Sequence, residues 1–161
     1  MTPTAAGTPA TASRPQGTGW ARRLAGIPLS LHQLLFRLAV AGVFLKAGMI
    51  KLSNWETTLA LFRDEYQIPV LPPEVAGVLA TTFELGCSTL LVLGLATRLA
   101  TLPLLTMIAT IQVFVYPGAW PEHLVWTSIL LFLLTRGAGR VSLDYLIIRA
   151  RSERENYGVQ K

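Results

Sequence analysis

The sequence predicts an all-α membrane protein: a bundle of four transmembrane helices with a disordered N-terminal tail and a short amphipathic C-terminal helix. The first observation is composition, because 52% of the 161 residues are hydrophobic and only 14% are charged, whereas soluble domains carry about 25% charged residues. The second is a series of long apolar runs. The third is that lysines and arginines gather at the ends of those runs, as in membrane proteins, and form no basic stripe of the kind that binds nucleic acid.

The chain begins with a segment that cannot form a core. Residues 1–28 are rich in Thr, Ala, Pro and Gly, so a disordered tail is predicted there. The first span, 30–52, contains Arg37 and Lys46 together with small residues such as Gly42 that allow close helix packing. A cleaved signal peptide is disfavoured because polar residues interrupt this run.

Three further apolar runs complete the predicted membrane domain, residues 30–148. The second span, 75–95, is long enough to cross a hydrocarbon core of roughly 30 Å at about 1.5 Å per residue. The third span is predicted at 99–116, with a proline in its first turn, where proline is tolerated. The fourth is predicted at 119–135 and is the shortest.

The basic residues also predict the orientation of the chain. Nine arginines flank the spans on the side of the two termini, and two basic residues, Lys51 and Arg63, flank them on the other side. Since cytoplasmic loops carry the excess of positive charge, both termini are expected in the cytoplasm. The basic segment 149–161, with Arg149, Arg151 and Arg154, is expected to form the amphipathic helix along the membrane surface.

Glu84 is the most informative single residue, because it lies in the middle of the second span. An unpaired carboxylate at that depth costs about 2.5–3.5 kcal/mol on insertion scales, so a partner is expected. Lys46 and Arg37 both lie within reach in depth, but they face opposite sides of their helix. The small residues on the face of Lys46 favour Lys46 as the partner, with Arg37 as the alternative.

Polar residues on the same two spans form the predicted site. Thr81, Glu84 and Ser88 share one stripe of the second span and should face the bundle interior. With Arg37 and Lys46 they make up the predicted ligand-binding set, in which Glu84 and Lys46 are the catalytic candidates. One interpretation is an ion pair that fixes helix register. The other is a site that binds a polar head group or exchanges protons.

The sequence predicts no metal site and no covalently bound cofactor. The single cysteine, Cys87, excludes an internal disulfide and a CxxC redox pair. The predicted topology puts His32 and His123 at opposite interfaces, so they are not expected to share a haem or a metal ion.

Three segments of the chain resemble the DoxX family of small four-helix membrane proteins. They are RLAVAGVFLKAGMIKL (37–52), FELGCSTLLVLGLATRLA (83–100) and RGAGRVSLDYLI (136–147), in this order and spacing. The motif positions are Arg37, Gly42, Lys46, Gly48, Lys51, Glu84, Gly94, Arg98 and Asp144. The resemblance implies a bacterial inner-membrane protein. It also draws attention to Arg98 and Asp144, which are expected to form a structural pair at the cytoplasmic face.

The resemblance also implies two classes of function. Relatives are linked to the oxidation of sulfur compounds with quinone as acceptor, and to membrane complexes in redox defence. The first hypothesis is therefore a quinone-linked subunit of a membrane oxidoreductase, working with a soluble or membrane redox partner. The alternative is a non-catalytic anchor or assembly component that recruits a soluble enzyme. A transporter is a third possibility that would require an oligomer.

Overall fold

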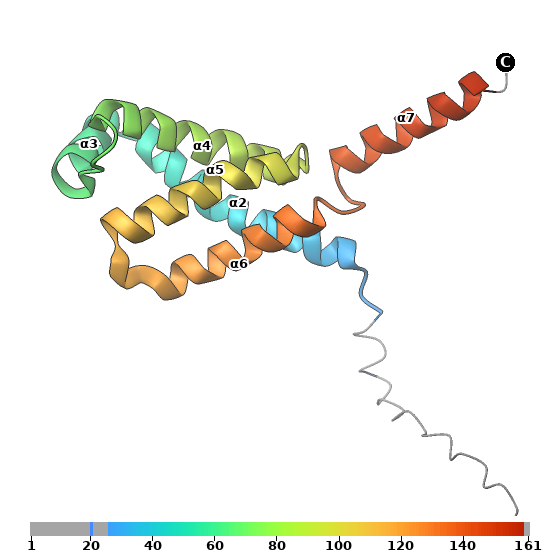
Figure 1. The fold of residues 1–161 in the computed structure, drawn as a ribbon, viewed down its shortest axis with the longest axis horizontal. Coiled ribbons are helices and arrows are strands. Elements are labelled where there is room, and N and C mark those ends of the chain that lie inside the picture. Colours follow the sequence, from blue (N-terminus) through green and yellow to red (C-terminus); the bar gives the residue numbers. More distant parts are fainter. Residues whose placement is uncertain (1–19, 21–25, 160–161) are drawn as a thin grey trace, which may run out of the picture.

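Four helices pack against one another and form the body of the protein, and their arrangement is seen in Figure 1. The computed structural model describes Trp20 and residues 26–159, with side chains described up to Glu153. The four are α2 (Leu29–Ser53), α4 (Pro73–Leu93), α5 (Thr97–Thr110) and α6 (Trp120–Arg136). The shorter elements are α3 (Trp55–Ala60), η1 (Leu61–Tyr66), η2 (Ile111–Val115) and η3 (Pro117–Ala119), and α7 (Leu143–Val159) follows the bundle. The tail predicted at 1–28 lies largely outside the described residues.

Within the described residues, three helical segments are long and apolar enough to cross a membrane: Leu29–Ser53, Pro73–Leu93 and Thr97–Val115. They correspond to the first three predicted spans. The predicted count of four is not confirmed, because α6 has 17 residues, which is at the lower limit for a transmembrane helix. Helix α6 packs against both α5 and α2, so it belongs to the bundle whether or not it crosses the bilayer.

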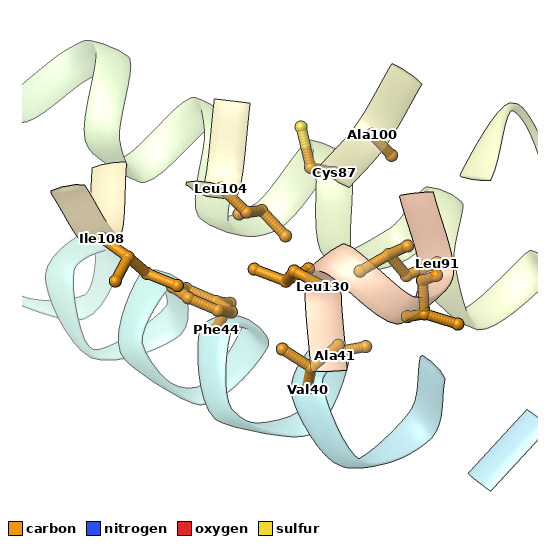
Figure 2. Close-up of a cluster of buried hydrophobic side chains, with 10 residues drawn as sticks. Val40, Ala41, Phe44, Cys87, Leu91, Ala100, Leu104, Ile108 and Leu130 are labelled. Atoms are coloured by element: carbon orange, nitrogen blue, oxygen red, sulfur yellow. The ribbon is translucent and has the colours of Figure 1, made fainter. Parts of the chain in front are cut away.

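The core lies where the four helices meet (Figure 2). Phe44 of α2, Leu91 of α4, Leu104 of α5 and Leu130 of α6 are all buried in one cluster, and Cys87 lies within it. Cys87 is thus a buried free thiol. Each of the four helices contributes to the core through one face and leaves its other apolar residues for lipid.

Helices α2 and α4 pack closely at Gly48. A Cβ atom added there would lie 2.8 Å from the side chain of Leu85 and 3.0 Å from the Cβ of Glu84. By contrast, Gly42 faces open space and Lys46 is exposed. The predicted small-residue seam on the face of Lys46 is therefore wrong, because the opposite face of α2 packs against α4.

The position of Pro103 in α5 and two π-helical turns differ from the predictions. Helix α5 begins at Thr97, so Pro103 lies inside the helix and not in its first turn. At the far end, α5 continues into the π-helical turn η2, and a second π-helical turn, η1, follows α3. These two turns lie at the same end of the bundle and pack against each other. Single π-helical turns occur frequently at functional sites.

Helix α7 extends away from the bundle (Figure 1). Its existence agrees with the prediction, but it is 17 residues long and does not have the predicted amphipathic pattern. The consecutive residues Tyr145, Leu146, Ile147 and Ile148 are all exposed. Because successive helical residues are about 100° apart, these apolar side chains surround the helix instead of forming one stripe.

Candidate functional site

Glu84 pairs with Lys51, and not with Lys46 or Arg37. The Nζ atom of Lys51 lies 2.7 Å from Oε1 and 2.9 Å from Oε2 of Glu84, so the ammonium group donates to both carboxylate oxygens. The two side chains are 16% and 5% exposed. The favoured pairing with Lys46 and the alternative with Arg37 are both corrected by this geometry.

The helical phase of α2 explains the choice of partner. A spacing of seven residues separates Arg37 from Phe44 and Phe44 from Lys51. Residues at that spacing lie on one face of a helix. That face is buried against α4 at Gly48. Lys46 lies on the opposite, exposed face, so its side chain is directed away from Glu84. The seven-residue spacing is the signal in the sequence that would have identified Lys51.

A cavity of about 210 Å³ lies beside the Lys51–Glu84 pair. Both residues contribute to its wall, which is otherwise mainly apolar. The apolar residues come from η1, α4, α5 and η2, and include Phe62, Leu79, Phe83, Met107, Ile111 and Val115. A mainly apolar cavity with a few charged or hydroxyl groups is typical of a small-molecule site.

Two tyrosines and a glutamate gather at the same end of the bundle, next to this cavity. The rings of Tyr66 and Tyr116 pack edge to face with centroids 5.9 Å apart, and both residues line the cavity. The hydroxyl of Tyr116 donates a hydrogen bond to Oε1 of Glu65. This bond raises the pKa of Tyr116, and burial raises the pKa of Tyr66. Both phenols are therefore protonated at neutral pH. The single O–H of Tyr116 is used by Glu65, which leaves Tyr66 as the phenolic donor next to the cavity.

The other residues of the predicted ligand-binding set lie elsewhere. Thr81 and Ser88 are buried in α4, as expected for the interior stripe, but neither lines the cavity. Among the described residues their hydroxyl groups have no hydrogen-bond partner. Arg37 is 1% exposed and lies at the opposite end of α2. Of the set, only Glu84 contributes to the cavity wall.

Arg37 and Gln33 fasten the loop after α6 to the start of α2. The Nη1 atom of Arg37 donates to the carbonyl oxygen of Ala138 at 3.0 Å. The amide of Gln33 donates to the carbonyl oxygens of Arg136 and Gly137 at 3.0 and 3.1 Å. The bond to Arg136 satisfies a carbonyl group that the C-terminal end of α6 leaves without an intrahelical partner, and the other two satisfy carbonyl groups of the loop. The role of Arg37 in the structure is thus to hold this loop.

Asp144 binds the N-terminal end of α5 and not Arg98. Its Oδ1 accepts from the N–H of Ala96 at 2.8 Å, and its Oδ2 accepts from the N–H of Thr97 at 3.3 Å. Arg98 instead donates to the carbonyl oxygen of Thr135 at 3.3 Å. The expected pair is therefore wrong. A carboxylate is favourable at a helix N-terminus because the first N–H groups of the helix point outward.

One further polar contact was not expected from the sequence. The Nδ1 atom of His123 lies 2.6 Å from Oε1 of Gln112, and Nε2 of Gln112 donates to the carbonyl oxygen of Pro117 at 2.8 Å. Since Oε1 of the amide can only accept, Nδ1 of His123 carries the proton. The contact joins α6 to the π-helical turn η2 and holds the end of the bundle next to the cavity.

Comparison with known proteins agrees with this architecture. A protein of Haemophilus influenzae (strain Rd), described only as an uncharacterized protein, is 27% identical over 135 residues, which cover 78% of this chain and 89% of that protein. No solved structure matches the chain. The model of the DoxX family matches residues 32–117, which include both members of the Lys51–Glu84 pair. The chain belongs to the DoxX family and is a multi-pass integral membrane protein.

Proposed function

We propose that the chain binds the head group of a quinone in the cavity beside Lys51 and Glu84, as a subunit of a quinone-linked oxidoreductase. The observation that supports this proposal is an apolar cavity whose wall includes a buried ion pair inside a membrane bundle. Membership of the DoxX family is consistent with it, because relatives of this family are linked to quinone-dependent oxidation.

The cavity residues fit the chemistry of a quinone head group. A quinone ring is apolar on its faces and carries carbonyl oxygens that accept hydrogen bonds. The rings of Phe62 and Phe83 suit the faces. The ammonium group of Lys51 and the hydroxyl of Tyr66 are donors that suit the carbonyl oxygens. The volume of about 210 Å³ suits a head group, with the isoprenoid tail left in lipid.

The proposed part of this chain in the reaction is to bind and to handle protons. A bound quinone accepts two electrons and two protons and becomes a quinol. The electrons are proposed to come from a partner redox protein. Lys51 and Glu84, joined by a hydrogen bond at 2.7 Å, supply a group that can give a proton and a group that can take one. Tyr66 positions the head group.

The test measures quinone binding by the purified chain in lipid nanodiscs. A short-chain benzoquinone and a short-chain naphthoquinone are titrated in turn, and binding is read from the quenching of tryptophan fluorescence. Saturable quenching is expected in the wild type. Ala80→Phe adds a ring to the cavity wall while keeping both members of the ion pair, and should weaken binding by about tenfold or more. Glu84→Gln should weaken binding and slow quinol formation when a thiol or thiosulfate and the partner are supplied.

The matched control is Ala39→Phe, which adds the same ring on the exposed face of α2. It should bind quinone like the wild type. Quenching that does not saturate, or that is equal in wild type, Ala80→Phe and Ala39→Phe, would show partition into lipid and contradict the proposal. Thermal unfolding of each variant separates loss of binding from loss of fold.

A second function is favoured by α7. This helix extends from the bundle with exposed apolar residues and with the exposed arginines Arg149 and Arg151 (Figure 1). The chain would then act as a membrane anchor or assembly component for a soluble enzyme. Absence of quinone binding in the wild type, together with loss of the enzyme from the membrane when residues 149–161 are deleted, would support this alternative.

A further inference from the structure

A second cavity lies at the opposite end of the bundle from the Lys51–Glu84 pair. Its volume is about 820 Å³. The start of α2, the N-terminal end of α5, the loop after α6 and the start of α7 form its wall. Nothing in the proposed quinone site uses these residues. We call it the arginine cavity, because Arg98 of α5 and Arg140 of the loop both line it.

The charge of the arginine cavity is positive. Asp144 is the acidic residue on its wall, and both of its carboxylate oxygens are bonded to the N–H groups at the start of α5. Within the described part of the chain, neither Arg98 nor Arg140 forms a salt bridge. The single side-chain bond of Arg98 goes to the carbonyl oxygen of Thr135, which leaves guanidinium N–H groups available.

A buried hydroxyl on the same wall also lacks a partner. Thr97 has no exposed surface and lines the cavity, and its Oγ1 has no hydrogen-bond partner among the described residues. A buried hydroxyl without a partner costs free energy. Arg98 and Arg140 bring two charged groups to one cavity, and Thr97 lies in the wall behind them.

The rest of the wall combines a few polar side chains, such as Ser30 and Gln33, with apolar side chains that continue onto the exposed surface. Leu29, Leu99 and Ile148 line the cavity and are 51%, 69% and 64% exposed. A free anion would gain nothing from these side chains. A molecule with an anionic head group and acyl chains would contact the arginines with one part and the leucines with the other.

We propose that the arginine cavity binds the phosphate of an anionic phospholipid, with Arg98 and Arg140 on the phosphate and the acyl chains along Leu29 and Leu99. Arginine suits phosphate because its planar guanidinium donates parallel hydrogen bonds to two oxygens. The lipid joins α2, α5, the loop after α6 and α7, so its binding stabilises the folded bundle.

The experiment titrates the purified full-length chain in detergent micelles with phosphatidylglycerol or phosphatidylcholine and counts bound lipids by native mass spectrometry. The first phosphatidylglycerol should bind about tenfold or more tightly than phosphatidylcholine. The double variant Arg98→Gln, Arg140→Gln should lose this preference. The matched control Arg149→Gln, Arg151→Gln removes the same charge from α7, outside the cavity, and should retain it.

If the two double variants lose the preference for phosphatidylglycerol to the same extent, the attraction between basic residues and acidic lipid is diffuse, and the proposal is overturned. Inorganic phosphate is added as a competitor. Displacement of the lipid by an equal concentration of phosphate would identify a free-anion site and overturn the lipid assignment. If the double variant Arg98→Gln, Arg140→Gln does not fold, thermal unfolding of the wild type tests the proposal instead. Phosphatidylglycerol should raise the transition temperature more than phosphatidylcholine does. The absence of that difference contradicts the proposal.

Discussion

At the scale of single residues, the pairing of Glu84 with Lys51 shows how far a sequence can lead. A carboxylate in the middle of an apolar run is easily recognised, and its need for a partner follows from the cost of a charge in hydrocarbon. The predicted partner, Lys46, is wrong because the small residues on its helix face lie on an exposed face of α2, whereas α4 packs against the other face, at Gly48. Lys51 lies near the end of α2, and its long side chain reaches Glu84 from there. Tyr66 and Tyr116 could not be assigned to the site, because tertiary packing brings them together.

The tyrosine contact gives a prediction at this scale. The hydrogen bond to Glu65 raises the pKa of Tyr116, so this phenol should lose its proton above the usual tyrosine value of about 10. The stability that the bond contributes is present below that value and is lost as the pH rises through the raised pKa. In a phenolate absorbance titration, Tyr116→Phe should remove a late-titrating component. Removal of an early component instead would contradict the contact.

At the scale of elements, the apolar runs predicted the long helices to within a few residues, because length and composition determine where the bundle helices lie. The π-helical turns η1 and η2 and the position of Pro103 inside α5 were missed. These features depend on contacts between distant segments. The loop after α6 and Asp144 were recognised as a motif, but their partners, Arg37 and the N-terminal end of α5, follow only from the fold.

Gly94 provides the test at this scale. It ends α4 with a φ of +67°, and a Cβ atom there would collide with the guanidinium group of Arg37 and the side chain of Ser142. Gly94→Ala should lower the free energy of unfolding by about 1–2 kcal/mol from backbone strain alone, and by more because Arg37 must move. Gly42→Ala is the matched control, since Gly42 faces open space. Equal stabilities of the two variants in thermal unfolding would contradict the structure around Arg37.

At the scale of the whole molecule, the membrane class and the helical bundle could be predicted from composition and apolar runs. The number of spans could not, because the 17 residues of α6 are near the lower limit of length. The two cavities at opposite ends of the bundle could not be predicted either, since each is lined by segments far apart in the chain.

Cysteine labelling tests the topology, in a Cys87→Ser background. The proposed arrangement, with both termini in the cytoplasm, requires that α6 crosses the bilayer. Gly118→Cys, before α6, should react with a membrane-impermeant maleimide added to intact cells, whereas Ser152→Cys in α7 should react only after the cells are opened. Both positions are exposed, so access does not depend on burial. Labelling of the two positions from the same side would mean that α6 does not span.

The central claim is that Lys51, and not Lys46, is the partner of Glu84. A double-mutant cycle measures it most directly. The free energy of unfolding is measured for the wild type, Lys51→Ala, Glu84→Ala and the double variant by thermal or denaturant unfolding. A parallel cycle uses Lys46→Ala in place of Lys51→Ala. The structure predicts a coupling energy of about 0.5–3 kcal/mol between Lys51 and Glu84, and additive effects of Lys46 and Glu84. Additive effects in the first cycle with coupling in the second would contradict the pairing, and with it the polar wall of the proposed quinone site.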